Sequence, residues 1–154
     1  MPRRLTAFAL AGVLAALSLI GLAAAQTAPD NAIKYRKAVM SAVGANMSAL
    51  AMIAKGEVEH AEALAAHAQM LADTSELATA AFRQNTDGSG RERTTALAKV
   101  WSDWDDFDEG MKAFTEEANK LASMAEAGDM DGLPSQIGAL GKTCKDCHDD
   151  FRSK

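Results

Sequence analysis

Two cysteines and a histidine in the run Cys144-Lys145-Asp146-Cys147-His148 are the residues with the clearest capacity for chemistry. Thiols at this spacing share one face of a helix, so each can add across one vinyl group of a haem. The imidazole that follows can lie under the porphyrin as the proximal ligand of the iron. Because C-x-x-C-H is the spacing of c-type haem attachment, the run predicts one covalent haem c.

Two other chemistries could use the same cysteines. A redox-active dithiol would act through Cys144 and Cys147 directly, but such pairs usually open a helix after a strand in a βαβ unit. Nothing strand-like precedes the motif in this sequence. A zinc site needs four ligands, so the cysteines and His148 would have to recruit His60 or His67. Haem attachment is the favoured interpretation, and the dithiol is kept as a check.

The element that must position this motif is a helix expected from Leu133 to Arg152. Apolar residues recur along it in steps of three and four, which is the spacing of a buried helix face. These residues are Leu133, Ile137, Leu140, Cys144, Cys147 and Phe151. Both cysteines are therefore predicted to face the core.

Residues 1–25 have the features of a secretory signal peptide. A basic start with Arg3 and Arg4 is followed by an apolar stretch from Leu5 to Leu22 and by three alanines that end at Ala25. We expect cleavage after Ala25, export to the periplasm and a soluble mature protein. A retained membrane anchor is less favoured, since no basic stop-transfer cluster follows. Export also suits the cysteines, because an unreacted pair there would tend to form a disulfide.

The mature chain, residues 26–154, is expected to be a single acidic domain. Its length suits one hydrophobic core. Removing Arg3 and Arg4 leaves 14 basic and 21 acidic residues, a formal charge of minus seven. Nucleic acid and anionic membranes are therefore not the expected partners, whereas a redox partner protein with a basic face would be attracted at low salt. The identity of that partner is unknown.

Four amphipathic helices are expected, at about 30–55, 57–72, 95–127 and 133–152. Asp30 is expected to cap the first, Gly56 and Gly128 supply stops after the first and third, and residues 75–82 form a less regular stretch. A polar connection at 84–93 carries no phosphate-binding pattern, so it is assigned no chemistry. Helices of this kind predict an all-α, antiparallel up-and-down four-helix bundle with the haem in its core.

Two residues of the first helix are candidates for contact with the haem. The buried face of this helix has a single charged member, Arg36, which could extend to water or could pair with a haem propionate through its planar guanidinium. Met40 lies one turn further along, and its thioether could reach the iron opposite His148. The other methionines are interpreted as core filler.

Two further groups of residues are more simply explained by structure. The third helix has an apolar face rich in aromatic residues, which predicts core packing, with one tryptophan also covering the haem. This face comprises Leu97, Trp101, Trp104, Phe107, Met111, Phe114, Ala118, Leu121 and Ala125. His60 and His67 could form a surface metal site or supply a second haem ligand, but positions at the solvated rim are favoured.

With these residues in hand, the mature chain resembles the cytochrome c′ family, the class II c-type cytochromes, along essentially its whole length. The resemblance rests on Lys34-Tyr35-Arg36, Val100-Trp101-Ser102-Asp103, the C-x-x-C-H run and Phe151-Arg152. Haem attachment near the C-terminus is its distinctive part. The resemblance implies a four-helix bundle with haem on Cys144 and Cys147, ligation by His148, Arg36 near a propionate and Arg152 on the proximal side.

The resemblance also places Met40 at the family's distal position. Many members have a non-coordinating residue there and a five-coordinate, high-spin iron, whereas a low-spin branch uses methionine as the sixth ligand. Members are often homodimers through their first two helices, so the resemblance implies a homodimer. The alanine-rich outer faces of this chain fit exposure to solvent equally well, so a monomer is the alternative.

The expected function is electron transport without enzyme activity, with His148 and Met40 as the two axial ligands. The alternative is binding of nitric oxide or carbon monoxide at the distal face, where Met40 is displaced or does not coordinate. A thiol–disulfide enzyme that uses Cys144 and Cys147 is the third hypothesis.

Overall fold

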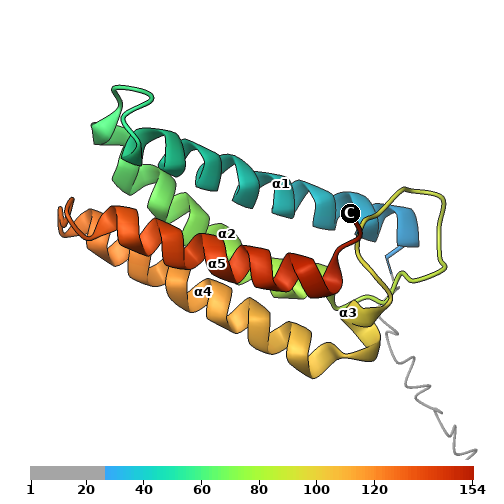
Figure 1. The fold of residues 1–154 in the computed structure, drawn as a ribbon. Helices are drawn as coiled ribbons and strands as arrows, with labels where there is room; N and C mark the ends of the chain where they lie inside the picture. Colours follow the sequence, from blue (N-terminus) through green and yellow to red (C-terminus); the bar gives the residue numbers. More distant parts are fainter. Residues whose placement is uncertain (1–26) are drawn as a thin grey trace, which may run out of the picture.

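The computed structural model describes residues 27–154, and the predicted signal peptide lies outside them. Four long helices, α1 (Pro29–Ala54), α2 (Leu64–Phe82), α4 (Trp104–Glu126) and α5 (Leu133–Phe151), run alternately up and down (Figure 1). A 3-10 turn, η1 (Ala61–Ala63), precedes α2, and the short α3 (Lys99–Ser102) precedes α4. The all-α, up-and-down four-helix bundle predicted from the sequence is confirmed.

The bundle is held together by the apolar faces that the sequence pattern indicates. Fully buried side chains come from every long helix and include Ile33, Leu50, Leu71, Leu121 and Leu140. Burying each such side chain stabilises the fold by about 1.5–3 kcal/mol. By length and composition α1 could also cross a membrane, but in this structure its buried face packs into the bundle core.

The second helix differs from the expectation at both ends. It begins at Leu64 and not at Glu57, and it continues through 75–82, so the predicted irregular stretch is wrong. Ser75 is fully buried and its hydroxyl donates to the Ala72 carbonyl at 2.7 Å. Satisfying the hydroxyl within the helix lets the chain stay helical while Ala78 and Phe82 pack against the core.

The third predicted helix is broken into two. Asp103 leaves the helical region (φ −127°, ψ 47°) between α3 and α4, and the chain before α3 is tied to the end of α5. The Leu97 amide donates to the Phe151 carbonyl at 2.9 Å, and the Ser153 amide donates to the Thr95 carbonyl at 2.8 Å. These long-range bonds satisfy backbone groups that a continuous helix from residue 95 would have used.

Residues 83–98, which connect α2 to α3 and are named the strap below, are also tied to α1. Asp30 Oδ1 accepts hydrogen bonds from the amides of Arg91 at 2.5 Å and Glu92 at 2.9 Å. Lys37 Nζ lies 2.6 Å from Glu92 Oε1. Asp30 thus anchors the strap. The N-cap residue of α1 is Ala28, which makes no side-chain hydrogen bond to the helix. The expectation that Asp30 caps the helix is therefore wrong.

The anchoring bonds make this end of the bundle sensitive to acid. The Glu92 and Arg91 amides hold the pKa of the Asp30 carboxyl below its ordinary value. A carboxyl with a lowered pKa in the folded state contributes stability that is present above its unfolded pKa of about 4. That contribution is lost as the pH falls through the lowered pKa, so acid loosens the strap.

Replacing Gly90 with alanine is expected to lower the free energy of unfolding by about 1–3 kcal/mol. Gly90 has φ +81°, and a Cβ there would overlap the Asp30 carboxylate and lie 3.3 Å from the Pro29 side chain. The matched control is Gly88→Ala, because Gly88 also has a positive φ of +64° but a Cβ there meets nothing within 4 Å. Urea denaturation followed by circular dichroism compares the two. Equal losses would show that the contact with Asp30 does not matter.

Candidate cofactor site

A cavity of about 1050 Å³ opens between α1, the strap, α4 and α5. Its size is close to the upper end of the range of about 300–1,000 Å³ typical of ligand sites. All the site residues singled out in the sequence line this one cavity: Arg36 and Met40 from α1, Cys144, Cys147 and His148 from α5, and Arg152 just after it. The fold therefore gathers them around a common space.

The two thiols lie in the last turns of α5 and are half-buried. Burial raises the pKa of the Cys147 thiol to about 11, with smaller contributions from Cys144 and Asp150. Burial likewise raises the pKa of Cys144. A redox-active dithiol needs a thiolate, and hence a lowered pKa, so this environment disfavours direct thiol–disulfide chemistry.

His148 follows the thiols and borders the cavity with an accessible ring. Partial burial lowers the pKa of its imidazole, Arg152 lowers it further, and Asp149 opposes both. The ring is therefore neutral at pH 7, which is the form that binds metals.

Arg36 is buried, with only 3% of its surface exposed, so the alternative in which it extends to water is excluded. Its Nη2 donates to Thr86 Oγ1 at 3.1 Å and to Thr94 Oγ1 at 3.2 Å. Its guanidinium carbon Cζ lies over the rings of Phe82 and Trp101, at 5.0 and 5.3 Å from their centroids. Its Nη1 is buried without a partner. A carboxylate entering the cavity would satisfy this donor and offset the cost of burying the charge.

Two glycines leave the cavity walls without a side chain. Gly44 in α1 and Gly110 in α4 line the cavity, and a Cβ at either position would meet nothing within 4 Å. Glycine inside a helix costs about 0.5–1 kcal/mol relative to alanine but lets the backbone approach a ligand. Together with the unpartnered donor of Arg36 and the cysteine and histidine set, these positions fit a flat, anionic haem.

The sequence did not reveal the contribution of the strap or of the phenylalanines. Arg93, Thr94, Thr95 and Ala96 form part of the cavity wall, although the connection had been assigned no chemistry. Its aromatic lining consists of phenylalanines, namely Phe82, Phe107, Phe114 and Phe151. Neither tryptophan lines the cavity, so the lining gives no support to the expectation that one covers the haem. Instead, Trp101 Nε1 donates to the Phe82 carbonyl at 2.8 Å and supports Arg36.

His60 and His67 lie away from the large cavity. The exposed His60 pairs with Glu62 at 3.2 Å, and the half-buried His67 bonds to Asn46 at 3.0 Å. Within residues 27–154, no group of three histidine, cysteine or acidic side chains is arranged to hold a metal ion. These histidines therefore have structural partners of their own.

Comparison with known proteins decides the family. The family model described as Cytochrome C′ matches residues 31–152. The chain belongs to the cytochrome c′ family. Cytochrome c′ from Halomonas halodenitrificans is 39% identical over 131 residues, which cover 82% of this chain and 98% of that protein.

Solved structures of cytochrome c′ have the same fold. Cytochrome c prime from Shewanella frigidimarina superposes with a TM-score of 0.76 at 32% identity, over 84% of this chain and 99% of that one. A ferrous variant of cytochrome c prime from Alcaligenes xylosoxidans with bound nitric oxide gives 0.73 at 31% identity, over 84% and 98%. The cytochrome c′ family binds haem c, which agrees with the chemistry of the cavity. The roles of the individual residues stay predictions.

Proposed function

We propose that this cytochrome c′ is a periplasmic electron carrier, without enzyme activity, that uses one covalent haem with His148 and Met40 as axial ligands. The observation that supports it is the position of Met40, which lines the same cavity as the C-x-x-C-H motif but from a different helix. A thioether facing the plate opposite a histidine gives a closed, six-coordinate iron suited to electron transfer.

Each lining residue has a defined part in this proposal. Cys144 and Cys147 would hold the haem through thioethers, His148 would ligate the iron, Arg36 would pair with a propionate and Arg152 would line the proximal side. When bound, haem supplies an iron that changes oxidation state by one electron. With haem bound, the phenylalanines of the cavity wall would exclude water from the site, and ligation by the Met40 thioether would raise the reduction potential and keep small ligands out.

Binding of a diatomic gas at the distal face is the second candidate function. It is favoured by Gly44, one turn beyond Met40 on the same wall, since a Cβ there would meet nothing within 4 Å and Met40 is only half-buried. This space would let the Met40 thioether move aside for a small ligand. The relative from Alcaligenes xylosoxidans has nitric oxide bound in its ferrous form, which supports the same possibility for this chain.

Replacing Met40 with alanine is expected to convert the ferrous protein from low spin to high spin, because the sixth ligand is removed. Carbon monoxide affinity should rise by about tenfold or more, because carbon monoxide no longer has to displace the Met40 thioether. A tenfold change corresponds to an iron–thioether binding free energy of about 1.4 kcal/mol. Absorption spectra in both oxidation states, magnetic resonance of the ferric iron and carbon monoxide titration measure this change.

Met47→Ala is the matched control. Met47 is also half-buried on α1 and lines the same cavity, so its loss removes comparable packing without removing the proposed ligand. Its spectrum should stay that of the wild type. If wild type and Met40→Ala are both high-spin with equal carbon monoxide affinity, Met40 only packs against the haem, and gas binding becomes the better assignment.

A further inference from the structure

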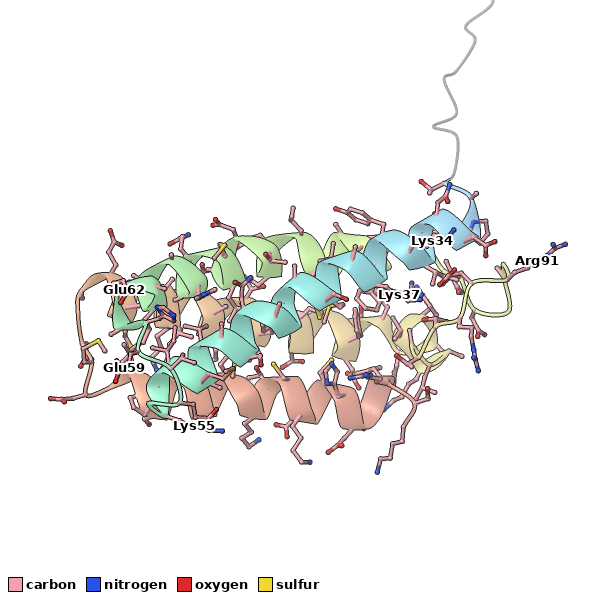
Figure 2. All side chains as sticks on the ribbon, turned by 90° about the horizontal axis from the view of Figure 1, so that it is seen from above. Lys34, Lys37, Lys55, Glu59, Glu62 and Arg91 are labelled. Carbon is pink, nitrogen blue, oxygen red and sulfur yellow. The ribbon has the colours of Figure 1, made fainter. Side chains whose placement is uncertain are left out.

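The net charge of the protein is confined to the half of the bundle away from the C-x-x-C-H motif and the strap. Residues 43–73 and 115–141 contain 2 basic and 9 acidic residues, whereas 27–42, 74–114 and 142–154 contain 12 of each. Figure 2 shows the two ends, with Glu59 and Glu62 at one and Lys34 and Arg91 at the other. The bundle therefore has a marked charge asymmetry along its axis, with the motif, the strap and most of the cavity lining in the neutral half.

At the cavity mouth the balance is locally positive. Lys34, Arg91 and Arg93 are exposed where α1 meets the strap, and Arg93 also lines the cavity. Among residues 27–154, none of these three forms an ion pair. Of the two nearby carboxylates, Glu92 pairs with Lys37, and Asp30, which also accepts the strap amides, offsets at most one of the three cations. These three cations are named the basic rim.

The opposite side of the mouth, on α5, adds little net charge. Its aspartates are each paired with a lysine: Asp146 with Lys142, Asp149 with Lys145 and Asp150 with Lys99. In the described part of the chain, the cavity lining includes arginine and lysine side chains but no carboxylate. Together with Arg152, which lines the cavity and is exposed, the basic rim is thus the charged surface beside the cavity that is available to a partner.

We propose that the basic rim is the docking surface for a redox partner protein with an acidic face. The inference rests on the proposed electron-transfer function and refines it, since the net charge alone predicted a basic partner. A basic partner would be attracted to the acidic far end of the bundle. That end lies roughly 39 Å from the cavity end, because the 26 residues of α1 rise about 1.5 Å each. An acidic partner is repelled there and attracted to the mouth, so the asymmetry also orients the encounter.

The sign of the local charge can be measured with small redox probes on the haem-loaded protein. One electron passes from the ferrous protein to hexacyanoferrate(III), giving the ferric protein and hexacyanoferrate(II), with no atom transferred. Raising the ionic strength from about 10 mM to about 200 mM shortens the Debye length from about 30 Å to below about 10 Å. We expect the higher ionic strength to slow the reaction several-fold, because salt screens the attraction between the anionic probe and the basic rim. A rate that rises with salt, as the net charge of the whole protein would give, overturns the proposal.

A matched pair of double variants tests where the attraction arises. Lys34→Glu with Arg91→Glu reverses two charges of the rim, and Lys55→Glu with Lys120→Glu makes the same change of net charge in the far half. The first should abolish or invert the salt dependence, and the second should leave it close to wild type. Equal effects of the two variants would mean that only net charge matters and would overturn the proposal.

A second measurement does not depend on electron transfer. Carbodiimide cross-linking to poly-L-glutamate, followed by peptide mapping, should label Lys34 several-fold more than Lys55, although both are exposed. Equal labelling contradicts the docking surface. Absorption spectra of the same samples report the axial ligands independently, so a failure of the proposed Met40 ligation is distinguishable from a failure of the docking surface.

Discussion

Replacing Cys144 and Cys147 together with alanine is expected to yield a protein without covalently attached haem, because each thiol is assigned to one vinyl group. The cavity of about 1050 Å³ would then lose the group that fills it. A cofactor that binds only the folded state stabilises it, so the melting temperature should fall by about 10 °C or more, corresponding to roughly 3 kcal/mol for a domain of this size. Acid-acetone extraction, mass spectrometry and thermal unfolding measure the two effects.

The single variants refine this test. Either cysteine replaced alone should leave haem held by one thioether or lost, which mass spectrometry of the extracted protein distinguishes. Thr143→Ala is a suitable control, since Thr143 adjoins Cys144 and its hydroxyl donates to the Leu140 carbonyl at 2.8 Å, but it has no thiol to attach haem. Covalent haem in full amount in the double variant would refute the attachment assignment.

Replacing Arg36 with leucine is expected to destabilise the haem-loaded protein by about 1–3 kcal/mol and to shift its reduction potential. The buried guanidinium has one unpartnered nitrogen, and a propionate that pairs with it would lose a charge-assisted hydrogen bond. In the haem-free protein, Arg36→Leu should lower the stability by less. A buried arginine with an unsatisfied donor contributes little stability, and a leucine in its place avoids the free-energy cost of desolvating a charge. Denaturant unfolding and potentiometry provide the measurements.

Arg83→Leu is the matched control for this prediction. Arg83 also stacks on a tryptophan, at 4.6 Å from the Trp104 ring, but it is exposed and outside the cavity. Its loss should change neither the potential nor the difference between the haem-loaded and haem-free proteins. A haem-bound crystal structure in which both propionates pair elsewhere would remove the basis for the Arg36 prediction.

Helix positions followed from the sequence wherever one helix face decides the structure. The stripe through Leu133 and Leu140 in α5 is buried as predicted, and so are Phe107 and Leu121 of the aromatic face in α4. The errors lie where distant segments compete with local preference. Good helix formers near Leu97 are not helical because their backbone pairs with residues 151–153, a contact that propensity cannot reveal.

The residues of the candidate site could likewise be predicted where they lie on a regular helix face. Residues with distinctive chemistry at helical spacing, such as His148 and Arg36, could be assigned to one cavity because facing helix stripes must meet. The strap residues Thr86 and Thr94 could not be assigned to the site from the sequence. They lie 50 and 58 residues after Arg36, and they reach it from an irregular connection. No periodicity marks such a contact in advance.

The strap ties the start of α1 to the end of α5. Asp30 at the start of α1 and Phe151 at the end of α5 both bond to strap backbone, so complete opening of the strap breaks its bonds to both helices. Such local opening also breaks the bonds of Thr86 and Thr94 to Arg36, and it exposes Arg36 and the neighbourhood of His148 together. Fraying of the turn between α4 and α5, at the opposite end, exposes neither.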